Sequence, residues 1–268
     1  MSTPSTAVLF VHGIQGQPKQ FQFLIDALPE GVEVRAPLLP GHGTTARDFH
    51  AARRIDWLAA VRAETQALLA EGKRVVYVGH SMGCLLGLLI SRELGNPYAG
   101  MLLLCCPFRP RIAGRLGDLF RSIGRKRGED PRLAASLEGN SVPVNGFRDS
   151  LYLLRPYADL FWLMDRARHI RPRAPEKIRF FFSGNDEVVS AASVKHARKW
   201  PAAELTILEG CGHCWFPEPE KQTLRDALNA MLLKMTRRAG RPGPDRRERG
   251  GADKQCLSLH SIIEGAIL

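Results

Sequence analysis

A glycine-flanked serine between a predicted strand and a predicted helix constrains this chain more than any other feature. Gly79-His80-Ser81-Met82-Gly83 follows the strand-like segment 73–78 and precedes the apolar segment 84–90. A serine on such a sharp turn has strained backbone angles, and glycine on both sides removes the clash that a side chain would make. Its oxygen is then exposed at the carboxyl edge of a sheet, at the positive end of the following helix. Ser81 is therefore the candidate nucleophile, and the alternative is a glycine-rich turn that only packs.

Apolar stretches of strand length alternate with helical stretches along most of the chain. The predicted strands are 6–11, 32–36, 74–78, 100–106, 178–182 and 204–208, and the predicted helices are 21–28, 57–70, 82–94, 193–199 and 218–235. Asp56 is expected to cap the second helix. Uniformly apolar strands that alternate with helices indicate a parallel sheet covered on both faces. The predicted fold class is therefore α/β, a doubly wound, mostly parallel sheet.

The alternation stops between Pro107 and Pro175. This segment is rich in arginine, is punctuated by glycine and proline, and contains amphipathic helical stretches such as 151–168. We therefore predict that it is a helical lid inserted over the carboxyl edge of the sheet, where ligands bind in such folds. We therefore expect a core of residues 1–107 and 176–236, a lid of residues 108–175, and a basic, disordered C-terminal tail of residues 237–268.

A serine nucleophile needs a base, and the base needs an acid that orients it. Asp186 follows the predicted strand 178–182, and His213 follows the predicted strand 204–208. Both strand ends lie at the edge where Ser81 is expected. In this fold, the three residues of such a site follow one another along the chain in the order Ser, Asp, His. A turn aspartate and a loop histidine are the alternatives. Glu187 is the second candidate for the acid.

The oxyanion hole of such a site uses backbone amides. The amide of Met82, directly after the nucleophile, is one expected donor. The amide of Ile14 is the other, because Gly13 allows the loop after the first strand to turn toward the pocket. His12 in this loop resembles a catalytic base, but we expect it to hold the loop by hydrogen bonding.

Five motifs together resemble the α/β-hydrolase superfamily, in particular bacterial carboxylesterases and monoacylglycerol lipases. They are Val11-His12-Gly13, Leu39-Pro40-Gly41-His42-Gly43, Gly79-His80-Ser81-Met82-Gly83, Gly184-Asn185-Asp186 and Gly212-His213. The resemblance covers roughly residues 5–235 apart from the lid. It implies hydrolysis of carboxylic esters through an acyl-enzyme, with small or medium-chain acyl esters or monoacylglycerol-like lipids as substrates. Thioester hydrolysis, acyl transfer, perhydrolysis and slow-turnover ligand reception remain alternatives with the same three side chains.

Two positions depart from the pattern of this group. Cys84 stands where a further glycine is usual, and Cys214-Trp215 follow the histidine where aliphatic residues are more common. The acyl or leaving-group pocket is therefore expected to be unusual. Its expected lining residues are Gly13, Leu154, Phe161 and Trp215.

No cofactor is expected. Cys211-Gly212-His213-Cys214 has the spacing of a zinc or dithiol site, but a second ligand pair is missing. We expect these cysteines to pack around the histidine loop, without a metal. The six cysteines show no spacing typical of a secreted scaffold, so reduced thiols are expected.

The net charge of +11 is unevenly distributed. Residues 108–175 hold fourteen Arg or Lys and seven Asp or Glu, so this segment carries +7. It allows weak contact with an anionic surface, although a solvated arginine-rich face is the simpler interpretation. Without a nucleic-acid motif, a leader or an apolar stretch of about 18 residues, we expect no nucleic-acid partner, no membrane span and a cytoplasmic location. The substrate is expected to be a small-molecule or lipid ester, and the oligomeric state is open.

Overall fold

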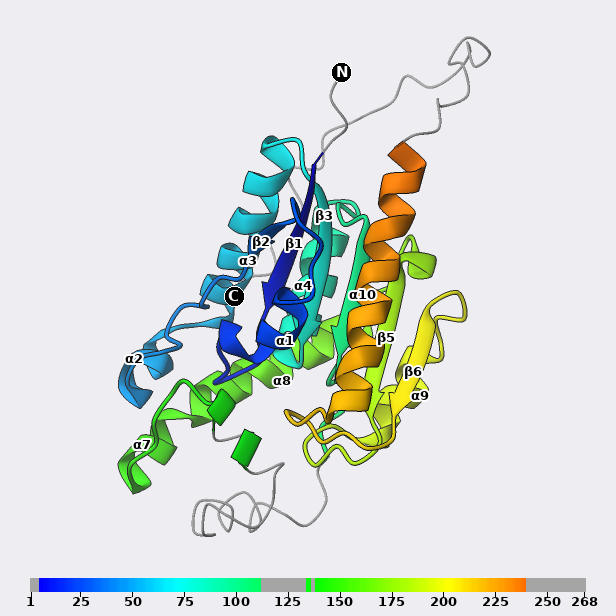
Figure 1. Ribbon diagram of the computed structural model, residues 1–268. Helices are drawn as coiled ribbons and strands as arrows, with labels where there is room; N and C mark the ends of the chain where they lie inside the picture. Colours follow the sequence, from blue (N-terminus) through cyan, green and yellow to red (C-terminus); the bar gives the residue numbers. More distant parts are fainter. Residues whose placement is uncertain (1–4, 112–133, 136–137, 240–268) are drawn as a thin grey trace.

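A six-stranded, fully parallel sheet forms the centre of the protein (Figure 1). The computed structural model describes residues 5–111, 134–135 and 138–239. The strand order is β2-β1-β3-β4-β5-β6, and every neighbouring pair is parallel. The strands are β1 (Thr6–Val11), β2 (Glu33–Arg35), β3 (Arg74–His80), β4 (Gly100–Leu104), β5 (Ile178–Ser183) and β6 (Glu204–Leu208). The predicted α/β fold with a parallel sheet is confirmed.

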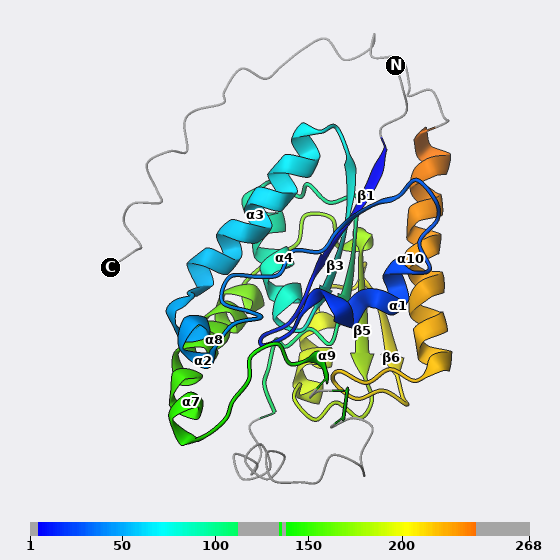
Figure 2. The ribbon, with the colours of Figure 1, turned by 60° about the vertical axis from the view of Figure 1, so that its left-hand side comes forward.

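Helices cover both faces of this sheet (Figures 1 and 2). The α-helices are α1 (Gln22–Ile25), α2 (Ala46–Ala51), α3 (Arg54–Ala70), α4 (Met82–Glu93), α7 (Phe147–Tyr152), α8 (Leu154–Arg168), α9 (Ala191–Ala197) and α10 (Glu218–Ala239). Two short 3-10 helices are η1 (Pro18–Phe21) and η2 (Pro175–Lys177). Asp56 was predicted as the cap of the helix over residues 57–70, but this helix, α3, begins at Arg54, three residues before its predicted start. Asp56 instead lies in the first turn and accepts a hydrogen bond from the Arg53 amide at 2.8 Å.

The two faces of the sheet form two hydrophobic cores. In β1, Ala7, Leu9 and Val11 belong to the core under α3, α4, α8 and α9, whereas Val8 and Phe10 belong to the core under α1 and α10. This alternation follows from the period of two residues in a strand. All five of these side chains are essentially fully buried. The central strands are mostly apolar because both of their faces are covered.

The described part of residues 108–175 includes helices α7 and α8. Both lie near the end of the molecule toward which the strand arrows point (Figures 1 and 2). Helix α8 packs on α4 through one face, formed by Leu160, Leu163, Met164 and Ala167. Much of the proposed lid, residues 112–133 and 136–137, lies outside the described residues, as does the predicted tail from residue 240 onward. Within the described chain, each helix is too short or too polar to cross a membrane.

Candidate active site

Ser81 lies on a sharp turn between β3 and α4. Its backbone has φ 51° and ψ −119°, a left-handed conformation that non-glycine residues rarely adopt. A Cβ atom on Gly83 would lie 2.0 Å from the carbonyl oxygen of Val11, and one on Gly79 would lie 2.9 Å from the amide nitrogen of Cys84. Both flanking glycines are therefore required by close backbone approaches. Because α4 touches the end of β1 here, the turn is fixed in position.

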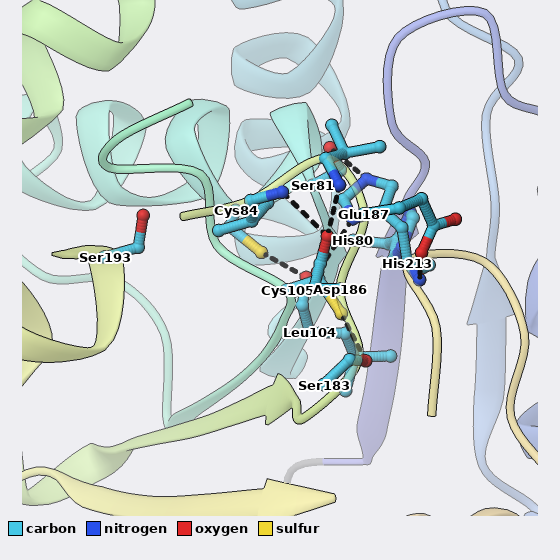
Figure 3. Close-up of polar contacts among 12 residues, drawn as sticks. His80, Ser81, Cys84, Leu104, Cys105, Ser183, Asp186, Glu187, Ser193 and His213 are labelled. Atoms are coloured by element: carbon cyan, nitrogen blue, oxygen red, sulfur yellow. Dashed lines mark hydrogen bonds and ion pairs between the residues drawn. The ribbon is translucent and has the colours of Figure 1, made fainter. Parts of the chain in front are cut away.

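Ser81, His213 and Asp186 form one hydrogen-bonded chain (Figure 3). Nε2 of His213 lies 3.0 Å from Oγ of Ser81, and Nδ1 of His213 lies 3.0 Å from Oδ2 of Asp186. The three residues come from the loops after β3, β6 and β5, which end at the same edge of the sheet. Each is at most 6% exposed. The structure thus brings together the three side chains that the sequence singled out.

The two neighbouring carboxylates hold His213 in different ways. Asp186 contacts the imidazole ring, and its other oxygen, Oδ1, accepts hydrogen bonds from the amides of Val188 at 2.9 Å and Val189 at 2.7 Å. Glu187 instead accepts the backbone amide of His213 at 2.9 Å. Asp186 therefore orients the ring, whereas Glu187 anchors the loop that carries it.

The Asp186–His213 contact shifts both pKa values toward the ionised forms. Burial raises the pKa of Asp186, but the His213 ring and the Val188 and Val189 amides outweigh burial and hold it below 3.8. Burial lowers the pKa of His213, but the charge and hydrogen bond of Asp186, aided by Glu187, raise it above 6.5. An imidazolium at this position is thus stabilised, as a base that accepts a proton from Ser81 requires.

The two expected oxyanion donors are the backbone amides of Met82 and Ile14. Met82 is the first residue of α4, and Ile14 lies in the loop after β1. Within the described residues neither amide has a hydrogen-bond acceptor. Gly13 was expected to supply an unusual turn, but its φ is not positive. Glycine is needed there for space, because a Cβ atom would lie 3.0 Å from Cβ of Ser81, and the positive φ of this loop, 56°, belongs to Gln15.

Two buried histidines hold the loop after β1, residues 12–16, which we call the oxyanion loop. Nε2 of His12 accepts the Leu39 amide at 3.0 Å while its Nδ1 donates to the Gly13 carbonyl at 2.8 Å. Nε2 of His42 accepts the Gln15 amide at 3.1 Å. Burial lowers the pKa of His12 to about 3 and that of His42 to about 4, so both rings are neutral at pH 7. The expectation that His12 holds the loop is confirmed, and the part that His42 plays was missed.

Residues from the proposed lid segment also contact this loop. The Tyr157 hydroxyl of α8 donates to Oε1 of Gln15 at 2.7 Å. Oγ of Ser141 donates to the carbonyls of Gln15 at 3.1 Å and Gly16 at 2.7 Å. These contacts join residues more than 120 positions apart in the sequence. No local motif marked Tyr157 or Ser141, which explains why sequence reasoning missed them.

Two of the four expected pocket residues are exposed side chains of α8. Leu154 is 66% exposed and Phe161 is 50% exposed, so neither packs into the core. The reason is helical periodicity, because both residues lie outside the face of α8 that packs on α4. Trp215 is half-buried beside the His213 loop, and its carbonyl accepts the Gly212 amide at 2.9 Å. Gly13 alone of the four is shown to approach Ser81 closely.

Cys105 and Cys214 each belong to a cluster of three side chains whose ligand atoms are close enough to hold a metal ion. His80, His213 and Cys214 form one set, and Cys105, Asp186 and His213 form the other, with ligand atoms in each set within 4.8 Å of one another. Both sets use His213, whose two ring nitrogens already contact Asp186 and Ser81. Cys211, the other half of the Cys-x-x-Cys motif, is buried and belongs to neither set.

Cys84 stands at the position after the serine motif where a further glycine is usual, and its side chain is accommodated in the core. The Cys84 thiol is buried and donates toward the carbonyls of Gly79 and Leu104, each at 3.2 Å. It thus lies between β3, β4 and α4. The departure from the family pattern at this residue concerns packing.

The chain belongs to the alpha/beta hydrolase family. The sequence profile of that family matches residues 8–225, which include all three residues of the hydrogen-bonded chain. The protein is accordingly a hydrolase. No curated protein matches the sequence.

Solved structures resemble this chain over most of its length. One comes from a study of LipS and LipT, two metagenome-derived lipolytic enzymes, with 20% identity, a TM-score of 0.64, and coverage of 87% of this chain and 96% of that one. A monoacylglycerol lipase from Paleococcus ferrophilus has 17% identity, a TM-score of 0.59, and coverage of 88% and 97%. A meta-cleavage product hydrolase from Pseudomonas fluorescens IP01 has 18% identity, a TM-score of 0.60, and coverage of 88% and 92%. At these identities the likeness shows a shared fold.

Proposed function

We propose that this protein is a serine hydrolase of carboxylic esters, with small or medium-chain acyl esters or monoacylglycerol-like lipids as its substrates. The observation that carries the proposal is the buried Ser81–His213–Asp186 chain beside two amides, of Ile14 and Met82, that have no acceptor among the described residues. A resemblance in fold to lipolytic enzymes and a monoacylglycerol lipase is compatible with this substrate class.

The proposed reaction has two halves. His213 takes the proton of Ser81 as the serine oxygen attacks the ester carbonyl, and the Ile14 and Met82 amides stabilise the resulting oxyanion. His213 then gives the proton to the leaving alcohol, which leaves an acyl group on Ser81. Water, deprotonated by His213, attacks this acyl-enzyme, and His213 returns the proton to Oγ of Ser81 as the bond to the acyl group breaks and the carboxylic acid leaves. Asp186 keeps the ring in the required tautomer throughout.

Replacement of the serine tests this mechanism directly. We expect Ser81→Ala to fold normally and to lose at least ~10³-fold in turnover of p-nitrophenyl esters, because oxyanion binding alone leaves little catalysis. A fluorophosphonate should label the wild-type protein at Ser81. The matched control is Ser183→Ala, a buried serine at the end of β5 that contacts Cys105 and not His213. Near-normal turnover by Ser81→Ala would refute the serine mechanism.

A substrate series separates the proposed function from its alternatives. Turnover should be compared for p-nitrophenyl esters from acetate to palmitate, for a monoacylglycerol, and for an acyl thioester of the same chain length. Faster turnover of the thioester would reassign the protein as a thioesterase. Fluorophosphonate labelling without turnover of any ester would favour a ligand receptor or an acyl-transfer enzyme.

A further inference from the structure

A cavity whose lining does not include the candidate catalytic side chains lies next to the Asp186 loop. It has a volume of about 580 Å³, and its walls come from the loop after β4, from α8 and from the start of α9. The lining residues are Arg109, Pro110, Arg111, Phe161, Met164, Arg168, Ser190, Ala191 and Ala192. Ser81, Asp186 and His213 are absent from this set. Phe161, expected from the sequence in the acyl pocket, is thus found here.

Positive charge is concentrated around this cavity. Three arginines line it, and only Arg168 has a carboxylate partner within the described chain, Asp165 at 2.7 Å. The half-buried ring of His196 lies nearby, and its pKa falls to about 4, first because of partial burial and then because of Lys199, Arg109, Arg168 and Arg171. Guanidinium groups that lack a carboxylate partner favour carboxylate and phosphate ligands, which they bind through paired hydrogen bonds.

The other wall of the cavity is apolar. Phe161 is 50% exposed and Met164 is buried at its edge, while Ala191 and Ala192 begin α9 on the opposite side. A volume of this size holds a ligand of several carbon atoms in addition to its charged group. The lining therefore matches a molecule with one anionic end and one apolar end.

The wall of this cavity is continuous with the loop that holds Asp186. Pro110 pairs with Val189 as an antiparallel bridge, and the Arg111 amide donates to the Val188 carbonyl at 2.9 Å. The amides of Val188 and Val189 are the groups that bind Oδ1 of Asp186. A ligand in the cavity would thus contact Pro110, Arg111 and Ser190, which adjoin the backbone segment that positions the acid of the candidate triad.

We propose that this cavity is a binding site for amphiphilic anions, with a carboxylate or phosphate at Arg109 and Arg111 and an apolar chain against Phe161 and Met164. The site is distinct from the one that performs the proposed ester hydrolysis, and binding to it does not require turnover. A free medium-chain fatty acid and a phosphorylated lipid fragment both have this combination of an anionic head group and an apolar chain.

Calorimetric titration of full-length Ser81→Ala protein tests this site without turnover. The probes are octanoate, octyl phosphate and the neutral octan-1-ol, at equal ionic strength. We expect one or both anions to bind and octan-1-ol to bind at least tenfold more weakly, because charge-assisted hydrogen bonds to arginine are lost. The stronger of the two anions identifies the headgroup. Absence of binding by both anions would overturn the proposal.

Substitution of the arginines locates the binding. Arg109 and Arg111 contribute only backbone groups to the hydrogen bonds of their loop, so Arg109→Gln and Arg111→Gln are expected to fold. The double variant, in the Ser81→Ala background, should bind the anion at least tenfold more weakly. Arg47→Gln, which removes an exposed arginine of α2 outside the cavity, is the matched control and should bind normally.

Wild-type protein labelled at Ser81 by a fluorophosphonate separates this cavity from the acyl pocket. The labelled protein should bind the anion as well as the Ser81→Ala protein does. If labelling abolishes binding, or if the double arginine variant binds as tightly as the Arg47→Gln control, the anion occupies the acyl pocket and the proposal is wrong. Neither result depends on whether esters are the true substrates.

Discussion

Asp186 and Glu187 are adjacent carboxylates that hold different atoms of the same histidine. Asp186 contacts the ring and is buried, whereas Glu187 is exposed and contacts only the backbone amide of His213. The chain offers both as candidate acids, and their sequence positions cannot separate them. The two carboxylates reach different atoms of His213 because the side chains of consecutive residues point in different directions from the loop after β5.

Paired substitutions test this division between the two carboxylates. We expect Asp186→Asn to lower ester turnover roughly 10³- to 10⁴-fold, because the amide no longer favours the imidazolium or the right tautomer. Glu187→Gln keeps an oxygen that accepts the His213 amide, so turnover should stay within about threefold of wild type. Steady-state kinetics on one p-nitrophenyl ester measures both. The reverse ranking would make Glu187 the acid.

At this scale the sequence predicted the polar residues better than the apolar ones. Ser81, Asp186 and His213 each follow a strand, and parallel strands bring their carboxyl ends to one edge whatever the details of packing. Leu154 and Phe161 were harder to place because their location depends on which face of α8 meets α4, and both faces carry large apolar side chains. Local sequence does not resolve that choice.

Helix α8 connects the proposed lid segment to the catalytic edge at two points. Tyr157 reaches the oxyanion loop through Gln15, and buried Asp159 binds the start of α3. The helix itself was predictable from its amphipathic period. Its partners were not, because they lie about 105 to 142 residues away in sequence.

The Tyr157–Gln15 hydrogen bond should stabilise the oxyanion loop. We expect Tyr157→Phe to lower kcat/KM by roughly 2- to 12-fold, the effect of one neutral hydrogen bond, with an unchanged fold. Tyr152→Phe is the matched control, because Tyr152 contributes its backbone carbonyl to His50. If both variants have wild-type kcat/KM, the loop is held without Tyr157.

The Asp159 carboxylate should stabilise the docking of α8. It accepts from the side chains of Arg53 and Arg54 and from the Arg54 amide. Burial opposes its ionised form, but these arginines outweigh burial and hold its pKa below 3.8. We expect Asp159→Asn to lower the free energy of unfolding by about 2–3 kcal/mol in urea titrations. Asp226→Asn, at an exposed position on α10, should change it little.

Across the described residues of the whole molecule, three buried histidines resist protonation. Burial lowers the pKa of His12 to about 3, of His42 to about 4 and of His80 to about 3. The unfolded chain takes up these protons near pH 6.5, whereas the folded protein does not. Stability is therefore complete above pH 6.5 and is lost as the pH falls toward 4. His213, with its raised pKa, acts in the opposite direction.

Acidification should weaken the fold well before the carboxylates titrate. Each buried histidine is expected to cost about 1.4 kcal/mol per pH unit below about pH 6, an effect that His213 partly offsets. Urea unfolding midpoints between pH 7.5 and pH 5 measure this slope. His42→Gln should reduce the slope, and His169→Gln, at an exposed position after α8, should leave it unchanged. A midpoint independent of pH over this range would contradict the prediction.

The order of the hydrogen-bonded residues along the chain has a consequence for protein synthesis. His213 lies 132 residues after Ser81, so the ribosome completes the nucleophile turn long before it adds the base. At about 5–20 residues per second, this delay is roughly 7 to 26 seconds. Under the proposed mechanism a nascent chain therefore carries an unactivated serine, and a translation product that terminates just before residue 213 is expected to be inert toward esters although it contains all six strands.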